Sequence, residues 1–387
     1  MGNKKQLKQP KIGVLGGGQL GRMLALDSAR LGIQLHFLDK SSDFPAGQVC
    51  QSNHFVIGDF TDYDSVINFG NDKDIVTIEI ENVNTEALKV LEAKGVKVYP
   101  SSNLINTIKD KGIQKKFYTQ HAIPTAEYFL AEDKASIISA INEKNWDYPF
   151  VQKARTEGYD GKGVQVIKAP ENLDQLWDRP SVIEVAVQID KELAIIIARS
   201  SHGSIAVYDP VEMVFDGEAN VLDYQKSPAS ITETQKQTLE KIARNLADKL
   251  DLVGVLAVEF FLTVSGDIRV NEAAPRTHNS GHHTIEACRC SQFEQQIRAI
   301  SGLPLGDTQL ISPSSMLNVL GEVDAHGIAH YEGLEDVLNI PEAKVHLYGK
   351  QSVKPKRKMG HINILSDNVS LVNKIKSLLK VKAYEQS

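Results

Sequence analysis

Short apolar runs alternate with helix-spaced apolar residues along the first part of the chain. Apolar runs at 11–15, 33–38, 74–80 and 96–99 predict strands, and the spacing of apolar residues over 22–31 predicts a helix between the first two. Strands that alternate with helices usually form a parallel sheet with its helices on both faces. We therefore expect an open parallel α/β domain of roughly one hundred residues at this end of the chain.

The pattern changes after Pro100-Ser101-Ser102, which breaks the alternation before a helix predicted over 104–118. Ile123-Pro124-Thr125 then opens a further unit. Thr232 begins a second helix, because Gln235 three residues later completes a capping-box pattern. The β-branched and aromatic runs that follow residue 148 predict strands at 149–154, 164–167, 182–187, 193–199, 205–207, 210–214, 314–320 and 344–348, and residues 284–300 are mostly helical in pattern.

A hairpin over residues 253–272 carries two carboxylates. If Ser265-Gly266 forms a two-residue loop, Val264 faces Asp267 and the ladder puts Glu259 directly opposite Glu272. Like charges so placed repel unless one is protonated or a cation lies between them. Removing one of the two charges is therefore expected to leave the stability of the metal-free protein unchanged or slightly higher. Mg²⁺ prefers carboxylate and phosphate oxygen, so the pair predicts a nucleotide-bound metal or, alternatively, a solvated strand end with one raised pKa.

A glycine turn, GGGQLG at 16–21, joins the first strand to the first helix, and Asp39 ends the second strand. Backbone N–H groups at such a helix start suit an anion, and with the acidic residue the pattern matches a dinucleotide fingerprint. The same geometry also holds any phosphate or carboxylate. Glu79 and Glu81 follow another strand at the sheet edge where α/β folds bind ligands, although exposed charges are equally compatible with that place.

Two further stretches are compatible with phosphate binding. Gly158 to Gly163, GYDGKG, forms a glycine-rich hairpin after a strand that contains Lys153, as in enzymes that cover ATP with a flexible loop. A lysine in an apolar strand needs a partner anion, which argues against an ordinary hairpin. The basic run from Lys350 to Lys358 suits either a phosphomonoester or a solvated loop.

Composition narrows the class of protein. The 387 residues are 42% hydrophobic and 24% charged with a net charge of -6, which is typical of a globular protein and gives no reason to expect nucleic acid. No apolar run reaches the length of a membrane span, and no signal peptide is recognised. Cys50, Cys288 and Cys290 are too few for a disulfide framework, so we expect a reducing, cytoplasmic location.

The order of these features resembles the ATP-grasp superfamily. Within it, four stretches resemble the 5-(carboxyamino)imidazole ribonucleotide synthases of purine biosynthesis: GGGQLGRM at 16–23, GYDGKG at 158–163, NEAAPRTHNSGH at 271–282 and RKMGH at 357–361. The resemblance covers nearly the whole chain after the first ten residues. It implies an N-terminal α/β domain over 11–115, an ATP-grasp lid domain over 116–187, and a C-terminal domain over 188–387 that carries the metal carboxylates and a terminal subdomain.

The resemblance also implies roles for individual residues. ATP would contact Lys111, Lys153, Gly158, Tyr159, Asp160, Gly161, Lys162, Gly163, Glu184, Val185, Ala186, Val187, Glu192, Glu212, Asn271 and Glu272, and Mg²⁺ would bind Glu259 and Glu272. Aminoimidazole ribonucleotide would contact Gln19, Leu20, Glu79, Asn279, Lys350, Arg357 and Lys358, the last three at its phosphate. The catalytic set would be Tyr159, Asp160 and Lys162 near the ring amine and bicarbonate, with Arg276 and His278 on the carboxyphosphate.

The implied enzyme is a homodimeric ligase that joins bicarbonate to aminoimidazole ribonucleotide with ATP. Its nearest alternative is a formate-using glycinamide ribonucleotide transformylase, in which Asp would be expected in place of Asn279. A nicotinamide-dependent dehydrogenase would leave Lys153 and the carboxylate pair unexplained. Zinc on His278, His282 and His283 lacks a fourth ligand of suitable spacing. Glu157 departs from the family pattern, which usually has a second Gly there, and this bears on the hinge of the lid.

Overall fold

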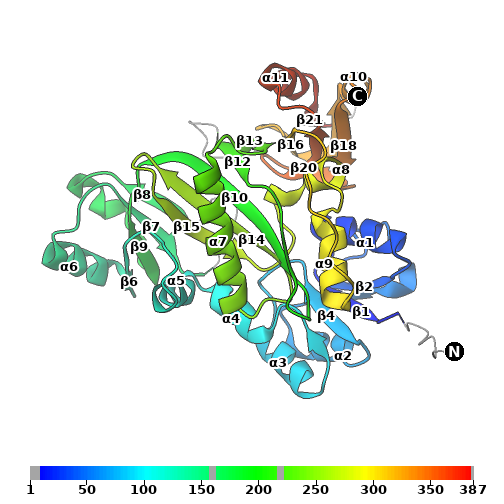
Figure 1. The fold of residues 1–387 in the computed structure, drawn as a ribbon, viewed down its shortest axis with the longest axis horizontal. Coiled ribbons are helices and arrows are strands. Elements are labelled where there is room, and N and C mark those ends of the chain that lie inside the picture. Colours follow the sequence, from blue (N-terminus) through cyan, green and yellow to red (C-terminus); the bar gives the residue numbers. More distant parts are fainter. Residues whose placement is uncertain (1–8, 157–162, 216–221, 385–387) are drawn as a thin grey trace.

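The computed structural model describes residues 9–156, 163–215 and 222–384. Its N-terminal part is the predicted parallel sheet, with strand order β3-β2-β1-β4-β5 (Figure 1). The strands are β1 Ile12–Leu15, β2 Leu35–Asp39, β3 Phe55–Ile57, β4 Ile75–Ile78 and β5 Lys97–Val98, and the helices between them are α1 Gln19–Arg30, α2 Tyr63–Gly70 and α3 Thr85–Ala93. Because β1 and β4 are neighbours, the glycine turn after β1 lies beside Glu79 after β4.

The helix predicted over 104–118 is two helices, α4 Ser102–Lys109 and α5 Lys111–Gln120. Asp110 between them has φ −110° and ψ 110°, and its carboxylate accepts hydrogen bonds from the backbone N–H groups of Gly112 and Ile113. An aspartate in this extended conformation caps the following helix instead of continuing the preceding one. The break lets α5 begin at Lys111.

A four-stranded antiparallel sheet follows, in the order β6-β9-β7-β8. Its strands are β6 Tyr128–Ala131, β7 Phe150–Ala154, β8 Val164–Ile167 and β9 Ser181–Val185. The pattern of the sequence did not predict β6 or the helix α6 Lys134–Lys144. Ile137 and Ile141 of α6 pack on Phe150 and Ile183, so the helix closes the core of this sheet.

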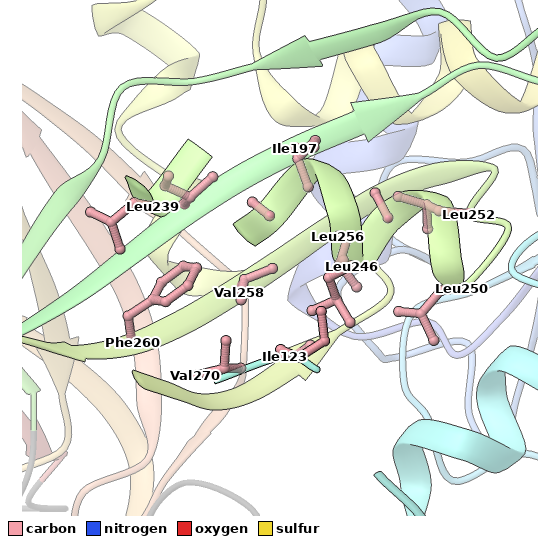
Figure 2. Packing of buried hydrophobic residues seen from close by; sticks show 14 of the residues in the cluster. Ile123, Ile197, Leu239, Leu246, Leu250, Leu252, Leu256, Val258, Phe260 and Val270 are labelled. Carbon is pink, nitrogen blue, oxygen red and sulfur yellow. The ribbon is translucent and has the colours of Figure 1, made fainter. Parts of the chain in front are cut away.

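The largest sheet runs β15-β14-β10-β12-β13-β16-β20-β18, and β11 also pairs with β10. Its strands are β10 Ile189–Arg199, β11 Ile205–Val207, β12 Val211–Phe215, β13 Leu222–Ser227, β14 Gly254–Thr263, β15 Ile268–Ala274, β16 Ser314–Leu320, β18 Ala343–Leu347 and β20 Lys358–Ile364. Helix α7, Glu233–Lys249, lies across β10 and β14 and has the predicted capping box at Thr232 and Gln235 (Figure 1). Figure 2 shows Leu239 and Leu246 of α7 packed against Leu256, Val258 and Phe260 of β14.

The last part of the chain adds a small sheet, β19-β17-β21, made of β17 Gly327–Glu332, β19 Ser352–Val353 and β21 Lys380–Ala383. Helices α10 Leu334–Leu338 and α11 Val369–Leu378 complete this subdomain, and only β16 and β18 of the region were predicted. The helix predicted over 284–300 is interrupted, with α8 Thr284–Ala287 and α9 Gln292–Ser301 as its pieces. In the described part of the chain, no helix combines the length and apolar character needed to cross a membrane.

Helix α9 joins the N-terminal sheet to the large one. Phe293, Ile297 and Ile300 of α9 share one buried cluster with Ile12 and Phe37 of the parallel sheet, and Figure 1 shows α9 beside α1. A continuous apolar core of this kind holds the two sheets in a fixed relation. The end of the hairpin of β14 and β15 lies against the carboxyl end of β4, since Arg276 after β15 pairs with Glu81 after β4 at 2.8 Å.

Candidate active site

The two carboxylates of the hairpin lie opposite each other as predicted, but the loop that sets them there differs. The backbone N–H of Thr263 donates to Asp267 O, so the loop has three residues, with Gly266 at φ 88°. A β-bulge between Val270 and Glu272 then restores the register, so that Glu259 pairs with Glu272. The prediction that Glu259 faces Glu272 is correct, and the prediction of a two-residue loop is wrong. Asn271 is the extra residue of the bulge, and it offsets the one-residue difference in the loop.

Two lysines from two elements converge on this hairpin. Lys111 of α5 forms a short ion pair with Glu272, and Lys153 of β7 donates to Asn271 Oδ1 at 2.8 Å. Lys153 Nζ also lies 2.9 Å from Glu184 Oε2, where the side chain of Glu184 is 3% exposed. The anion that a buried Lys153 requires is thus Glu184 of the neighbouring strand β9.

The two opposed carboxylates carry different charges near neutral pH. Burial raises the pKa of Glu259 to about 8, and the charge of Glu272 adds to the rise. The ammonium of Lys111 lowers the pKa of Glu272 to about 2 against the opposing effect of burial. In the metal-free protein, Glu259 is therefore the carboxylate that takes up a proton first, and Glu272 is the one that stays ionised to lower pH.

The oxygen atoms of this hairpin fit Mg²⁺. Glu259 and Glu272 supply two carboxylates on one face, and Asn271 supplies an amide oxygen beside them. Mg²⁺ bound with ATP usually takes one or two carboxylates and completes its shell with phosphate and water. Within the described residues, no group of three or more His, Cys, Asp and Glu side chains is arranged so that protein groups alone would hold a metal.

Glu192 and Glu212 lie on opposite faces of the large sheet. Glu192 faces Met213 and Phe261, on the face of Glu259, and burial raises its pKa to about 7. Glu212 pairs with Leu193 in register, so its side chain points to the α7 face. There its carboxylate binds Lys191 at 3.1 Å and Lys226 at 3.3 Å, and accepts from Ser230 N. Strand alternation thus turns Glu212 to the face opposite Glu192 and Glu259, and its contact with ATP stays a prediction.

The glycine turn after β1 is occupied by the chain's own carboxylates. Glu79 accepts from Gly18 N at 2.7 Å and from Leu20 N at 3.1 Å, and Asp39 accepts from Gly17 N at 2.7 Å. A Cβ at Gly18 would lie 2.5 Å from Glu79 Oε1, so the close approach requires glycine. A dinucleotide phosphate would find these donors already used. The glycine turn and Asp39 therefore no longer support the alternative of a nicotinamide-dependent dehydrogenase.

Three of the residues predicted to bind the ribonucleotide lie together beside this turn. Lys350 Nζ donates to Gln19 Oε1 at 2.9 Å and to Lys358 O at 2.7 Å, although the first pair is separated by 331 positions in the chain. Arg357 Nη1 donates to the backbone and side-chain oxygens of Ser352. Lys350 of the basic run thus lies against the start of α1, and Arg357 and Lys358 are partly buried, whereas Lys354 and Lys356 are exposed.

The loop after β15 links the hairpin to the N-terminal sheet. Arg276 Nε lies 2.8 Å from Glu81 Oε1, and Arg276 Nη1 donates to Thr277 O. His278 Nδ1 lies 3.0 Å from Ser280 Oγ and 3.9 Å from Glu259 Oε1. Asn279 follows His278 at the start of a short 3-10 helix, Asn279–Gly281. Both predicted carboxyphosphate residues therefore lie between the carboxylate pair and the glycine turn.

The other predictions divide into three groups. Glu157, Gly158, Tyr159, Asp160, Gly161 and Lys162 lie outside the described residues, whereas Gly163 directly precedes β8 and has φ 78°. Val185, Ala186 and Val187 end β9 and lead into β10. His282 and His283 are buried, with pKa values lowered by burial, and their Nδ1 atoms contact the amides of Gln292 and Gln225, so the two rings belong to the core.

Sequence reasoning missed two charged residues of the site. Lys115 contacts Glu184 at 2.9 Å from the side opposite Lys153. Arg155, directly after β7, binds Asp110 at 2.9 Å and ties the end of β7 to the break before α5. Lys111 and Lys115 are four positions apart on one helix, and this spacing was the available signal that both face the same way.

Comparison with known families assigns three consecutive parts of the chain. A model of the ribonucleotide synthetase preATP-grasp domain matches residues 9–109, a model of the ATP-grasp domain matches residues 116–293, and a model of the phosphoribosylaminoimidazole carboxylase C-terminal domain matches residues 314–375. The fold is thus an ATP-grasp fold preceded by an open parallel α/β domain.

Whole-chain comparisons agree with these matches. The N5-carboxyaminoimidazole ribonucleotide synthase of Bacillus subtilis is 37% identical over 92% of this chain and 91% of its own length. The phosphoribosylaminoimidazole carboxylase of Ogataea methanolica is 39% identical over 93% of this chain. The chain spans about two thirds of that relative and of similar plant and yeast carboxylases, at 67%, 65% and 64% of their lengths.

Solved structures resemble this one over almost its full length. The N5-carboxyaminoimidazole ribonucleotide synthetase of Thermotoga maritima superposes with a TM-score of 0.88 at 38% identity, over 97% of this chain and 100% of its own. The enzyme of Aspergillus clavatus, crystallised with ADP and 5-aminoimidazole ribonucleotide, superposes with a TM-score of 0.84 at 33% identity, over 95% of this chain and 96% of its own.

Proposed function

The chain belongs to the N5-carboxyaminoimidazole ribonucleotide synthase family of ATP-grasp enzymes, and we propose that it carboxylates 5-aminoimidazole ribonucleotide with bicarbonate and ATP. One observation supports this proposal above the others. Arg276 follows the hairpin of Glu259 and Glu272 and pairs with Glu81, which follows β4 beside the glycine turn, and Gln19 at that turn accepts from Lys350. The residues proposed for the nucleotide and those proposed for the ribonucleotide are thus linked through Arg276.

The proposed reaction activates bicarbonate, which is a poor electrophile. An oxygen of bicarbonate attacks the γ-phosphorus of ATP, the bond to the β-phosphate oxygen breaks, and ADP leaves. The carboxyphosphate so formed releases inorganic phosphate and CO₂. The exocyclic amine of the ribonucleotide attacks this CO₂ and loses a proton, which gives the carboxyamino product. Because free CO₂ and carboxyphosphate are lost to water, both sites must lie in one enclosed space.

On the nucleotide side, Lys111 and Lys153 are the cations that neutralise the transferring phosphoryl group. The proposed ATP contacts are Lys111, Lys153, the hairpin from Gly158 to Gly163, the segment Glu184 to Val187, Glu192, Asn271 and Glu272. Glu259 and Glu272 would hold Mg²⁺, which supplies positive charge to the phosphates when bound. Asn271 would orient Lys153, because its amide oxygen already accepts from that ammonium at 2.8 Å.

On the ribonucleotide side, Lys350, Arg357 and Lys358 are proposed to hold the 5′-phosphate, since a fork of N–H donors and two ammoniums suit a dianion. Gln19, Leu20, Glu79 and Asn279 are proposed to contact the remainder of the ribonucleotide. Arg276 would stabilise the carboxyphosphate, with His278 beside it. Tyr159, Asp160 and Lys162 of the glycine hairpin are proposed to approach the ring amine and bicarbonate.

Further proposals concern the protein as a whole. The ranges 11–115, 116–187 and 188–387 are proposed as its domains, and a homodimer as its assembly. A cytoplasmic location is consistent with Cys50, Cys288 and Cys290 as free thiols.

The direct test is an ADP-release assay with two substrate pairs. ADP should form with aminoimidazole ribonucleotide and bicarbonate, and formate with glycinamide ribonucleotide should not replace them. Equal turnover with the formate pair would refute the proposal. Avidin should have no effect, because the proposed route passes through carboxyphosphate and not through biotin.

A further inference from the structure

Lys115 has no role in the function proposed above, yet it is among the most enclosed charges of the site. Its side chain is 3% exposed, and Nζ lies 2.9 Å from Glu184 Oε1. The contact is a close ion pair between two buried side chains. A charge is this strongly buried only where its partners hold it in place.

A second contact fixes Lys115 from the opposite side. Its ammonium donates to Thr125 Oγ1, and the hydroxyl of Thr125 in turn donates to Val270 O at 2.8 Å. Val270 directly precedes Asn271 and Glu272 on β15. Lys115 is thus anchored between β9 and the strand that carries the metal carboxylate.

Glu184 is shared between two lysines. Its Oε1 faces Lys115, its Oε2 faces Lys153, and each distance is 2.9 Å. Lys111, the other ammonium of α5, is engaged with Glu272 and does not pair with Glu184. The buried carboxylate of Glu184 therefore balances Lys153, which is assigned to the nucleotide, and Lys115, which has no assigned role.

This sharing has a consequence for nucleotide binding. If Lys153 turned to the phosphates and no other cation faced Glu184, an ionised carboxylate would remain buried without a partner, which is strongly unfavourable. Burial lowers the pKa of Lys115 to about 8, so its ammonium is still charged at pH 7. The counter-ion that Glu184 needs at that moment is already present.

We propose that Lys115 is a positioning residue for nucleotide binding: it neutralises Glu184 so that Lys153 can transfer from Glu184 to the phosphates of the bound nucleotide. This inference rests on the proposed function, since it takes Lys153 as a phosphate ligand. It assigns Lys115 no contact with ATP. Its effect is confined to the nucleotide, because the ribonucleotide corner at Lys350 shares no contact with Glu184.

The test compares Lys115→Met with Lys115→Arg and with Lys116→Met. Lys116 is the next residue of the same helix and is exposed, so its variant controls for the loss of a lysine from α5. The dissociation constant for ADP with Mg²⁺ is measured by calorimetry, and the KM values for ATP and ribonucleotide are measured by ADP release.

Lys115→Met should weaken ADP binding and raise the KM for ATP by about tenfold or more, since removing one partner of a buried ion pair is costly. The KM for the ribonucleotide should stay within about twofold, and Lys116→Met should match the wild type. Lys115→Arg keeps the charge and should recover most of the affinity. If the methionine variant does not fold, Lys115→Gln, which retains a donor for Thr125, carries the same expectation.

An ADP affinity of Lys115→Met within about twofold of the wild type would overturn the inference, as would an equal rise in both KM values. The proposed function fails separately, if the wild type binds Mg-ADP but releases no ADP with ribonucleotide and bicarbonate. In that case the calorimetric comparison still decides the role of Lys115. A wild type that does not bind ADP would refute both.

Discussion

The opposed carboxylates Glu259 and Glu272 should respond differently to removal of charge, and this asymmetry is the sharpest test of the site. From the sequence alone, replacing either one relieves a repulsion and leaves the metal-free protein unchanged or more stable. In the structure, Lys111 pairs with Glu272, whereas burial and the charge of Glu272 raise the pKa of Glu259, so Glu259 takes up a proton before Glu272 does. Glu272→Gln therefore removes the counter-ion of Lys111, and Glu259→Gln removes the carboxylate that protonates first.

The magnitude follows from exposure. Breaking a fully buried pair costs about 3 to 5 kcal/mol, and breaking an exposed one costs about 0 to 1 kcal/mol. The side chains are 18% exposed for Lys111 and 43% for Glu272, so solvent screens this pair. We expect Glu272→Gln to destabilise the metal-free protein by about 1 to 2 kcal/mol, or roughly 1 to 3 °C in melting temperature for a chain of 387 residues. Glu259→Gln should shift it by less than about 1 °C.

Thermal melts at pH 7 without metal or nucleotide measure this difference, and the same melts with Mg-ADP test the second half of the reasoning. Both variants should lose most of the stabilisation that Mg-ADP gives the wild type and should lose turnover, because each removes one oxygen ligand proposed for Mg²⁺. A metal-free Glu272→Gln that melts at or above the wild type would refute the charge assignment. So would a Glu259→Gln that is the less stable of the two.

Three further predictions use other parts of the site. Glu192→Gln should gain stability relative to the wild type as pH rises from 5 to 8. Burial raises the pKa of Glu192 to about 7, so the protonated side chain stabilises the folded wild type below pH 4.5, and this stabilisation is lost as pH rises through 7. Melts at both pH values check this. Gly18→Ala should raise the KM for the ribonucleotide, since its Cβ would displace Glu79 from the turn, and an unchanged KM would contradict that reasoning. Arg357→Ala should raise the KM for the ribonucleotide alone and Lys153→Ala that for ATP alone; parallel effects in steady-state assays would exclude separate sites.

How far the sequence predicts the fold depends on whether local or distant contacts decide an element. The strands of the parallel sheet are apolar runs buried on both faces, so β1, β2 and β4 were predicted within a few residues. The short strands β17 and β21 of the terminal subdomain expose much of their surface, and each pairs with a segment distant in the chain, so no local pattern marks them.

The site shows the same division. Register counting put Glu259 opposite Glu272 because two departures from the assumed hairpin, a longer loop and a bulge, cancel at that pair. The capping of α5 by Asp110 was a local signal that was overlooked. The partners of Glu184 could not be inferred, since the contact requires three elements to pack together, and strand alternation around Glu212 needs the pairing partners of β12.

The charge pattern of the site explains why its lysines can serve phosphates at all. Three ammoniums, on Lys111, Lys115 and Lys153, face the two ionised carboxylates Glu184 and Glu272, which leaves one surplus positive charge where the phosphates are proposed to bind. Each lysine assigned to the nucleotide is held by a carboxylate in the free protein. Lys115 can take over Glu184, and a metal ion on the carboxylate pair can take over Glu272. Nucleotide and metal should therefore bind with positive coupling, since each exchange of partners leaves no buried carboxylate unpaired.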